Sequence, residues 1–447
     1  MQRMTPRRRI AHLLRRAGFG GTPADIDAYM ALGFDRAVDR LVDYEAVSNA
    51  EVDARVAAME EELDVARLPP NQAVWLYRML HTARPLEERM TLFWHDHFAT
   101  ANSKVGRPEA MRAQNALFRS HALGSFRELL YGVSRDPAML RWLDSNSNRR
   151  ASPNENYARE LMELFTMGVG NYTEFDVREA ARAFTGWFFD RNRGFVFNQN
   201  QHDFGSKTFL GRTGDWDGDD IVDIILEEPV TAGYVAGKLF RHFVHDHPTP
   251  ATISRLAGAF RASDYNVREL VRAILRSPEF SSDEAYHTLV KSPVEYLIGT
   301  MKVLGLDEYA RDAMGMLNRM GMAIYNPPDV SGWDWGADWI GAATLLERLN
   351  AANTLSTLRG DNARFGLDPA AIVQHLGART PEQVVDRLLD LLVDGDVPAS
   401  VRGELLSYMT RDYVGSPESF LQDESRLDRT VRGVTHLIMS TPVYQMA

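Results

Sequence analysis

The chain has 447 residues, of which 45% are hydrophobic and 25% are charged, as is ordinary for a globular protein. Its formal net charge of −11 argues against nucleic acid as a partner, because phosphate backbones bind to basic faces. The absence of cysteine excludes disulfides, thiolate zinc sites, iron–sulfur clusters and cysteine nucleophiles. Any metal ion would need His, Asp, Glu, Asn or water, and no apolar run reaches the ~20 residues of a membrane span.

The N-terminal residues predict a basic amphipathic helix over about 7–17, because apolar side chains recur there at helical spacing. A glycine-rich turn follows, and Thr22 and Pro23 match the N-cap and first residue of another helix. The apolar run before Arg15 is too short for the core of an export signal. We therefore expect no export signal, a cytoplasmic location by default, and an N-terminal helical segment over 1–68.

Helical periodicity continues through most of the remaining chain. The predicted fold class is therefore mainly α, a multi-helical globular protein. The exception lies near 188–211, where aromatic residues between Gly, Asn and Asp predict a small β-hairpin insertion. We expect a core helical domain over 69–358 that contains this hairpin, followed by a C-terminal helical lobe over 359–447.

The segment 152–187 holds an unusually dense group of ionisable side chains and predicts two consecutive helices. Ser152 and Pro153 match an N-cap and a first helical residue, and Glu155 has the position of the acid in a capping box. The first helix should continue to about residue 168. Because only a short glycine-rich corner separates it from the second helix, the two helices should pack closely.

One face of the first predicted helix carries Asn156, Glu160 and Glu163, with Arg159 beside them. Glu160 and Glu163 are one turn apart, so both can reach one metal ion or one substrate hydroxyl. Arg159 and Glu163 also have the spacing of an ordinary ion pair. The face is therefore either a solvated surface or a polar site, in which the charged residues act in catalysis and Asn156 binds substrate.

His97 is a further candidate, from the sequence W-H-D-H-F near the end of another predicted helix. The motif resembles a metal-binding H-x-H, but helix positions two apart point about 200° away from each other. His97 aligns with the apolar side of its helix, whereas His95 faces outward or toward a neighbour. His97 is therefore either a core residue, or a single metal ligand or general base that meets the carboxylate face.

The predicted hairpin adds His202, Asp203 and Lys207 as candidates, since loops on a rigid scaffold often carry binding groups. His202 and Asp203 can be further metal ligands or an acid/base pair, and Lys207 can neutralise a bound anion. The alternative is a turn in which Asp203 caps its own backbone. The predicted ligands of one divalent metal ion are His97, Glu160, Glu163, His202 and Asp203.

The loop over 326–333 reads N-P-P-D-V-S-G-W and leads into the tryptophan cluster Trp333, Trp335 and Trp339. Indole rings can stack against sugars, so the cluster predicts a substrate-binding platform that includes Trp333. The alternative is a packed loop with buried indoles. Asp329, in the same loop, is an extra carboxylate that can contact substrate.

Six segments make the chain resemble the bacterial family DUF1800, a domain of unknown function. They occur in family order and cover most of residues 7–355. The segments are HLLRRAGFG (12–20), FWHDHFAT (93–100), the block from NENYARELMELFTMGVG to AARAFTGW (154–187), HDFGSKTFLG (202–211), KSPVEYLIG (291–299) and NPPDVSGW (326–333). The resemblance implies no catalytic residues. It implies frequent export, although this chain lacks the signal segment of many members, and a companion protein of the sulfatase-like family DUF1501.

Two functions follow as hypotheses. The first is a hydrolase acting on polysaccharide or envelope material, in which Glu160, Glu163, His97 and Arg159 line a catalytic cleft. The cleft would use one divalent ion or a carboxylate pair. The second is a non-catalytic helical binding or assembly partner of the DUF1501 companion. Convergence of both histidines and two unpaired carboxylates on a cavity favours the enzyme, whereas complete Arg–Glu pairing with separated histidines favours the partner.

Overall fold

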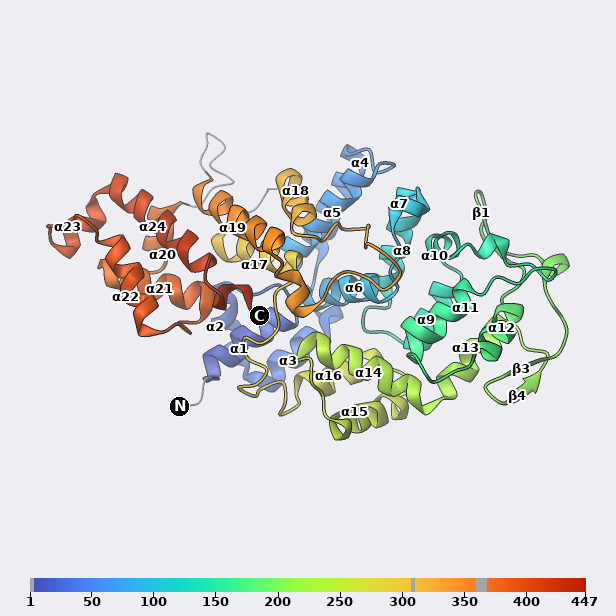
Figure 1. The fold of residues 1–447 in the computed structure, drawn as a ribbon. Coiled ribbons are helices and arrows are strands. Elements are labelled where there is room, and N and C mark those ends of the chain that lie inside the picture. The colour runs from blue at the N-terminus through green and yellow to red at the C-terminus, as the bar shows by residue number, and fades with distance from the viewer. Residues whose placement is uncertain (1–3, 307–309, 359–367) are drawn as a thin grey trace.

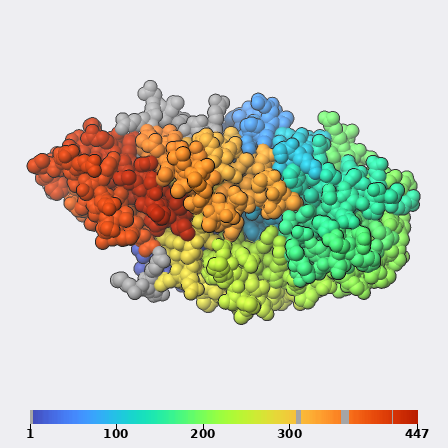
Figure 2. Space-filling model, viewed as in Figure 1, coloured from blue at the N-terminus to red at the C-terminus, as the bar shows by residue number. Residues whose placement is uncertain are grey.

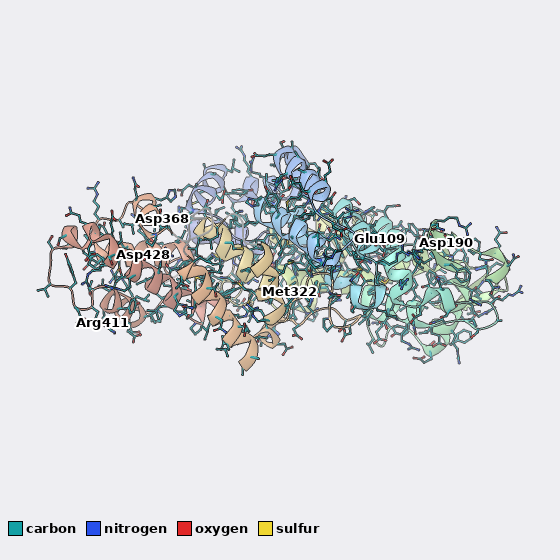
Figure 3. The ribbon with its side chains drawn as sticks, turned by 90° about the horizontal axis from the view of Figure 1, so that it is seen from above. Glu109, Asp190, Met322, Asp368, Arg411 and Asp428 are labelled. Carbon is teal, nitrogen blue, oxygen red and sulfur yellow. The ribbon has the colours of Figure 1, made fainter. Side chains whose placement is uncertain are left out.

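The computed structural model describes residues 4–306, 310–358 and 368–447. Figure 1 shows an elongated body built almost entirely of helices, with the strands toward one end and the last helices of the chain at the other. Figure 3 shows the same outline from above, with Met322 near the middle of the long axis. The described residues therefore confirm the predicted mainly α fold class.

The N-terminal helices lie beside the middle of the molecule (Figure 1). The predicted basic helix is confirmed as α1, and it buries Ile10 and Leu13. Thr22 caps α2 and forms a capping box with Asp25, so this predicted helix start is also confirmed. The helices of this part are α1 (Pro6–Arg16), α2 (Pro23–Leu32), α3 (Phe34–Val42) and α4 (Ala50–Glu62).

The next group of helices includes α6, which lies near the middle of the molecule (Figure 1). Both α5 and α6 have prolines in their first turn, where a missing amide hydrogen costs no helical bond. The helices of this part are α5 (Leu68–His81), α6 (Pro85–His97), α7 (Asn102–Val105), α8 (Pro108–Ser120), α9 (Phe126–Ser134) and α10 (Pro137–Trp142).

The helix predicted to begin at Ser152 begins later, so the predicted capping box is wrong. Its N-cap is Glu155, and no side chain caps the first turn. Ser152 instead pairs its backbone with Arg149 in a turn that precedes the helix. The Asn154 side chain accepts a hydrogen bond from the Asn156 amide (2.9 Å) within this entry turn.

The same helix changes type midway along its length. It starts as α11 (Asn156–Glu160) and continues as the π-helix η3 (Leu161–Thr166). After a glycine-rich corner, α12 (Glu174–Ala183) begins with Thr173 as its N-cap. The two consecutive helices expected in this segment are therefore present, but the first begins later than expected and its second half is a π-helix, which is wider than an α-helix.

The predicted β insertion contains two short antiparallel hairpins instead of one. β1 pairs with β2, and β3 pairs with β4. The strands are β1 (Trp187–Asp190), β2 (Gly194–Phe197), β3 (Lys207–Phe209) and β4 (Arg212–Gly214). The location near 188–211 is therefore correct, and the second hairpin extends three residues beyond it.

The remaining helices form the other long part of the body (Figure 1). Helix α13 lies near α9 and α12 at the strand end, α14 to α19 lie toward the middle, and helices α20 to α24 form the far end. They are α13 (Gly218–Glu227), α14 (Pro229–Phe243), α15 (Pro250–Ala262), α16 (Val267–Leu275), α17 (Pro293–Leu304), α18 (Ala310–Arg319), α19 (Ala342–Thr357), α20 (Pro369–His375), α21 (Pro381–Val393), α22 (Ala399–Met409), α23 (Pro417–Gln422) and α24 (Glu424–Met439).

The buried apolar side chains form two large cores, and α6 contributes to both. Phe93 and Trp94 belong to a core shared with α1, α9 and α14, whereas Leu92 belongs to a core shared with α5 and α17. The C-terminal helices share the second core with α17 and α19, as Leu355 and Val434 show. The predicted division of the chain at 68 and 358 stays a prediction.

Candidate functional site

A cavity lies over α6, where the two cores meet. Its lining comes from α6, from His242 in α14, from the segment 289–295 and from the loop between α18 and α19. Figure 2 shows a hollow in which blue atoms of α6 lie between orange and yellow-green atoms. The empty space between these side chains, which includes open solvent at the mouth, is about 560 Å³.

Three tryptophans line this cavity, which we call the tryptophan pocket. Trp333 and Trp339 are buried, whereas Trp335 is 39% exposed and donates from Nε1 to Asp246 (2.9 Å). Phe93 of α6 lines the same cavity. The indoles are therefore packed into the loop, as one interpretation of the sequence expects, and they also present an aromatic wall to a cavity.

Asp96 of α6 lines the tryptophan pocket and holds the loop against the helix. The Trp333 amide donates a hydrogen bond to Asp96 Oδ1 (2.8 Å). The neighbouring Gly332 has a φ of 100°, and a Cβ at this position would collide with the Asp96 side chain. Glycine is required here because the backbone conformation and the close approach both exclude a larger residue.

Burial raises the pKa of Asp96 to about 6. The Trp333 amide and the positive charge of Lys238 oppose this effect without restoring the ordinary value. A carboxyl group that titrates near neutral pH can both donate and accept a proton, as acid/base catalysis requires. Sequence reasoning missed Asp96, although it lies between the two histidines of the H-x-H motif.

A set of hydrogen-bonded polar side chains lies on the side of the pocket formed by α14 and α17. Arg89 makes an ion pair with Glu295 (2.7 Å) and donates from Nε to His242 Nε2 (2.9 Å). Glu295 also accepts from the Ser292 amide (2.7 Å) and so caps α17. Burial, followed by the charge of Arg89, lowers the pKa of His242 well below its ordinary value, so its ring is neutral.

The π-helix η3 offers backbone carbonyls to side chains from other helices. Leu164 O accepts hydrogen bonds from Tyr234 Oη (2.9 Å) and Lys238 Nζ (3.3 Å), both in α14. Phe165 O lies 3.0 Å from His97 Nε2. Widening of the helical turn frees these oxygens from their regular partners, and π-helical segments occur often at functional sites.

His97 is a buried, neutral residue with both ring nitrogens engaged. Lys238 Nζ donates to His97 Nδ1 (3.3 Å), so Nε2 carries the proton toward Phe165 O. Burial and then the charge of Lys238 lower the pKa of His97 well below its ordinary value. These contacts match the core interpretation of His97 and leave neither nitrogen free to bind a metal ion.

The other histidine of the motif, His95, is fully buried in different surroundings. Its ring contacts the rings of Trp75, Tyr325 and Trp333. The two histidines therefore point away from each other, as helix geometry requires, and they do not form a chelating pair. His95 faces a neighbour, which is one of the two orientations expected from its position.

Glu160 and Glu163 are partly buried, and they lie close enough to influence each other. Burial raises the pKa of Glu160, the charges of Glu163 and Asp329 add to this effect, and Arg159 opposes it. Tyr172 donates a hydrogen bond to Glu163 (2.6 Å). The structure therefore brings Asp329, from the loop that carries Trp333, into the electrostatic range of the carboxylate face.

Arg159 makes ion pairs with Glu155 (3.0 Å) and Glu174 (2.7 Å). The spacing of the sequence had also suggested Glu163 as its partner, and Glu163 bonds to a tyrosine instead. Because Glu174 begins α12, Arg159 ties the first helix of the motif to the second. Asn156 is exposed on the same helix.

The hairpin candidates belong to a separate group around Arg182. Asp203 makes an ion pair with Arg182 (2.7 Å) and accepts from the Gly205 amide (2.8 Å), as the capped-turn interpretation expects. Lys207 donates to the Gly205 carbonyl (3.0 Å). These contacts give Asp203 and Lys207 structural roles within the hairpin region.

The five predicted metal ligands divide among three places. Glu160 and Glu163 lie on the π-helix side, His97 bonds to the π-helix backbone, and His202 and Asp203 belong to the hairpin region, where His202 Nδ1 lies 2.8 Å from a backbone carbonyl. Within the described residues, no group of three or more His, Cys, Asp or Glu side chains is placed to hold a metal ion.

The fold and the pocket define a mainly α-helical protein with an aromatic cavity over a central helix. The chain belongs to the DUF1800 family, whose model, described as a protein of unknown function, matches residues 12–446. This match confirms the resemblance drawn from the six segments. No curated protein and no solved structure matches the chain. In the described part of the chain, no helix has both the length and the apolar character that crossing a membrane requires.

Proposed function

We propose that this DUF1800 chain is a hydrolase that binds a sugar unit of a polysaccharide in the tryptophan pocket. Asp96 is the proposed acid/base residue. The observation that carries the proposal is a carboxyl group with a pKa of about 6 on the wall of an aromatic cavity. Aromatic faces can stack on sugar rings, and a carboxyl group with this pKa can protonate a leaving oxygen near neutral pH.

Hydrolysis of a glycosidic bond by carboxyl groups needs a second carboxylate. We assign this role to the pair Glu160 and Glu163. Support comes from Asp329. Its charge helps to raise the pKa of Glu160, and it lies on the same short loop as Trp333.

Other residues predicted for the site take supporting roles in this proposal. Asn156 and Asp329 contact substrate at the rim, and Arg159 sets the charge around Glu160. Lys207 remains outside the proposal because its ammonium group bonds within the hairpin. The proposal uses the carboxylate pair because the predicted ligands of a divalent ion lie in separate places.

The test measures binding and hydrolysis of a panel of oligosaccharides by the full-length protein. We expect Asp96→Asn to keep substrate affinity and to reduce the hydrolysis rate at least about 100-fold. Asp203→Asn is the matched control, because its carboxylate lies in the segment between the two hairpins and pairs with Arg182, so the variant should leave the rate unchanged. An Asp96→Asn variant that hydrolyses as fast as the wild type would contradict the assignment of Asp96.

A non-catalytic role is the second candidate, and specific contacts favour it. Arg159 and Arg182 both make ion pairs with neighbouring carboxylates, and His97 and His202 lie in separate surroundings. This is the arrangement expected of an assembly partner for a DUF1501-type companion. Pull-down of the companion by a chain that hydrolyses no oligosaccharide would favour this candidate over the enzyme.

A further inference from the structure

Glu295 lines a second cavity as well as the tryptophan pocket. We call this cavity the lysine pocket, because Lys291 lies on its wall. The empty space between its side chains, which includes open solvent at the mouth, is about 570 Å³. Most of its other side chains are apolar and come from α1, the turn after it, α2, α17 and α21. They are Ala11, Phe19, Ile26, Val303, Leu391 and Leu392.

The Lys291 amine contacts a backbone carbonyl and an aromatic ring instead of a carboxylate. Its Nζ donates to Tyr444 O (2.7 Å) and lies 4.0 Å from the centre of the Tyr444 ring. The two carboxylates on the same wall, Asp394 and Glu295, each form an ion pair with an arginine (2.7 Å in both cases). Within the described residues, Lys291 makes no ion pair of its own.

These surroundings favour the neutral form of the Lys291 amine. Burial lowers its pKa to about 7, the charges of Arg15 and Arg348 add to this effect, and those of Glu295 and Asp394 oppose it. An ordinary lysine has a pKa of about 10.4 and is almost entirely protonated at neutral pH. A neutral amine is a nucleophile, and lysines that are desolvated or lie beside another cation are the ones that form imines in enzymes.

We propose that Lys291 forms an imine with a small aldehyde or ketone whose apolar part lies against the apolar wall of the lysine pocket. Nζ attacks the carbonyl carbon, a C–N bond forms, and the carbonyl oxygen leaves as water with the two protons of the amine. The imine nitrogen then takes up one proton from solvent. Its N–H can keep the hydrogen bond to Tyr444 O, and its charge can keep the contact with the ring. This site goes beyond the proposed function, because it uses an amine in a different cavity.

The chain has only five lysines among its 50 basic residues, so the reactivity of each can be measured separately. The full-length protein is treated with benzaldehyde and cyanoborohydride, whose hydride reduces the imine carbon and leaves a stable secondary amine. Mass spectrometry of peptides then gives the labelling rate of each lysine. At pH 7 we expect Lys291 to be labelled at least tenfold faster than Lys104, which is exposed and pairs with Asp144 (2.8 Å).

The pH dependence of this ratio tests the neutral amine. Between pH 7 and 10 an ordinary lysine loses its proton, whereas Lys291 has already lost most of its own near pH 7. The ratio of the Lys291 rate to the Lys104 rate should therefore fall as pH rises. A ratio that stays constant overturns the inference, because the faster labelling would then not come from a neutral amine.

Lys302 is the matched control for the cavity. Burial lowers its pKa as well, but it does not line the lysine pocket, so it should be labelled at least tenfold more slowly than Lys291. Ile26→Trp, which adds bulk to the wall, should slow labelling of Lys291 at least fivefold and leave Lys104 unchanged. Equal labelling of Lys291 and Lys302 overturns the inference, as does an unchanged Lys291 rate in folded Ile26→Trp. If that variant does not fold, the comparison with Lys302 in the wild type decides. Either result leaves the proposed function standing, since that function is measured with oligosaccharides.

Discussion

Asp96 serves the structure and the proposed chemistry through the same carboxyl group. Its hydrogen bond from the Trp333 amide favours the ionised form, whereas burial favours the protonated form. Burial is the larger effect, so the pKa rises to about 6. Asp203 has the opposite balance, because its ion pair with Arg182 lowers its pKa. The two residues therefore make a matched pair for measuring how pH acts on stability.

We expect Asp96→Asn to change how stability depends on pH. The folded protein binds the Asp96 proton more tightly than the unfolded chain, so ionised Asp96 destabilises the wild type above about pH 6. This loss should fade as pH falls from about 6 toward about 4, the ordinary range of an aspartate. The wild type should then gain about 2 kcal/mol relative to the variant between pH 7.5 and 4 in urea unfolding.

Asp203→Asn should show the opposite sign in the same experiment. Its lowered pKa stabilises the wild type above the ordinary aspartate range, and protonation removes this stability as pH falls. The wild type should therefore lose stability relative to this variant as pH falls below about 4. A difference between wild type and Asp96→Asn that stays constant with pH would contradict the raised pKa of Asp96.

At the scale of elements, the loop over 326–333 depends on one glycine. Gly332→Ala should destabilise the protein by about 2 kcal/mol or more, because φ is 100° and the added Cβ would collide with Asp96. Gly336→Ala is the control, since its φ of 56° is left-handed but its nearest contact is an ordinary 3.6 Å. Thermal unfolding should show a clearly smaller loss for Gly336→Ala, and equal losses would contradict this account of the loop.

The π-helix η3 is the second element whose stability should depend on a single side-chain contact. Tyr234→Phe removes the hydroxyl that donates to Leu164 O, so the backbone of the π-helix should open more readily. We expect faster amide hydrogen exchange over 161–168 and a loss of about 1 kcal/mol in stability. Tyr172→Phe is the control because its hydroxyl binds the Glu163 side chain instead of the backbone. Unchanged exchange in Tyr234→Phe would show that the hydroxyl does not hold the π-helix.

At the scale of the whole molecule, the shared second core couples the C-terminal helices to the middle of the protein. All eight tryptophans lie between residues 75 and 339, so their fluorescence reports only on that part. Because Leu355 and Val434 belong to one core, we expect fluorescence and far-ultraviolet circular dichroism to show the same unfolding midpoint. Loss of helical signal in a separate, earlier step would instead identify 359–447 as an independent lobe.

The sequence by itself determined features that local chemistry specifies. The Thr22–Pro23 helix start, the amphipathic helix α1 and the place of the β insertion were all predictable, because periodicity and caps involve residues within one element. The six DUF1800 segments were likewise recognisable along the chain. Local reasoning failed at Ser152, where a backbone bridge to Arg149 replaced the expected capping box.

Only the tertiary structure decided which residues form the candidate site. Asp96 meets Trp333 across 237 positions of sequence, and Lys238 reaches His97 across 141. The same packing engages both nitrogens of His97 and leaves the His242 and Trp333 donors unpaired among the described residues. Such outcomes depend on burial and on contacts between distant segments, which no local pattern encodes. The sequence contains the candidate residues, and the packing of α6, α14 and the loop between α18 and α19 determines which of them lie together.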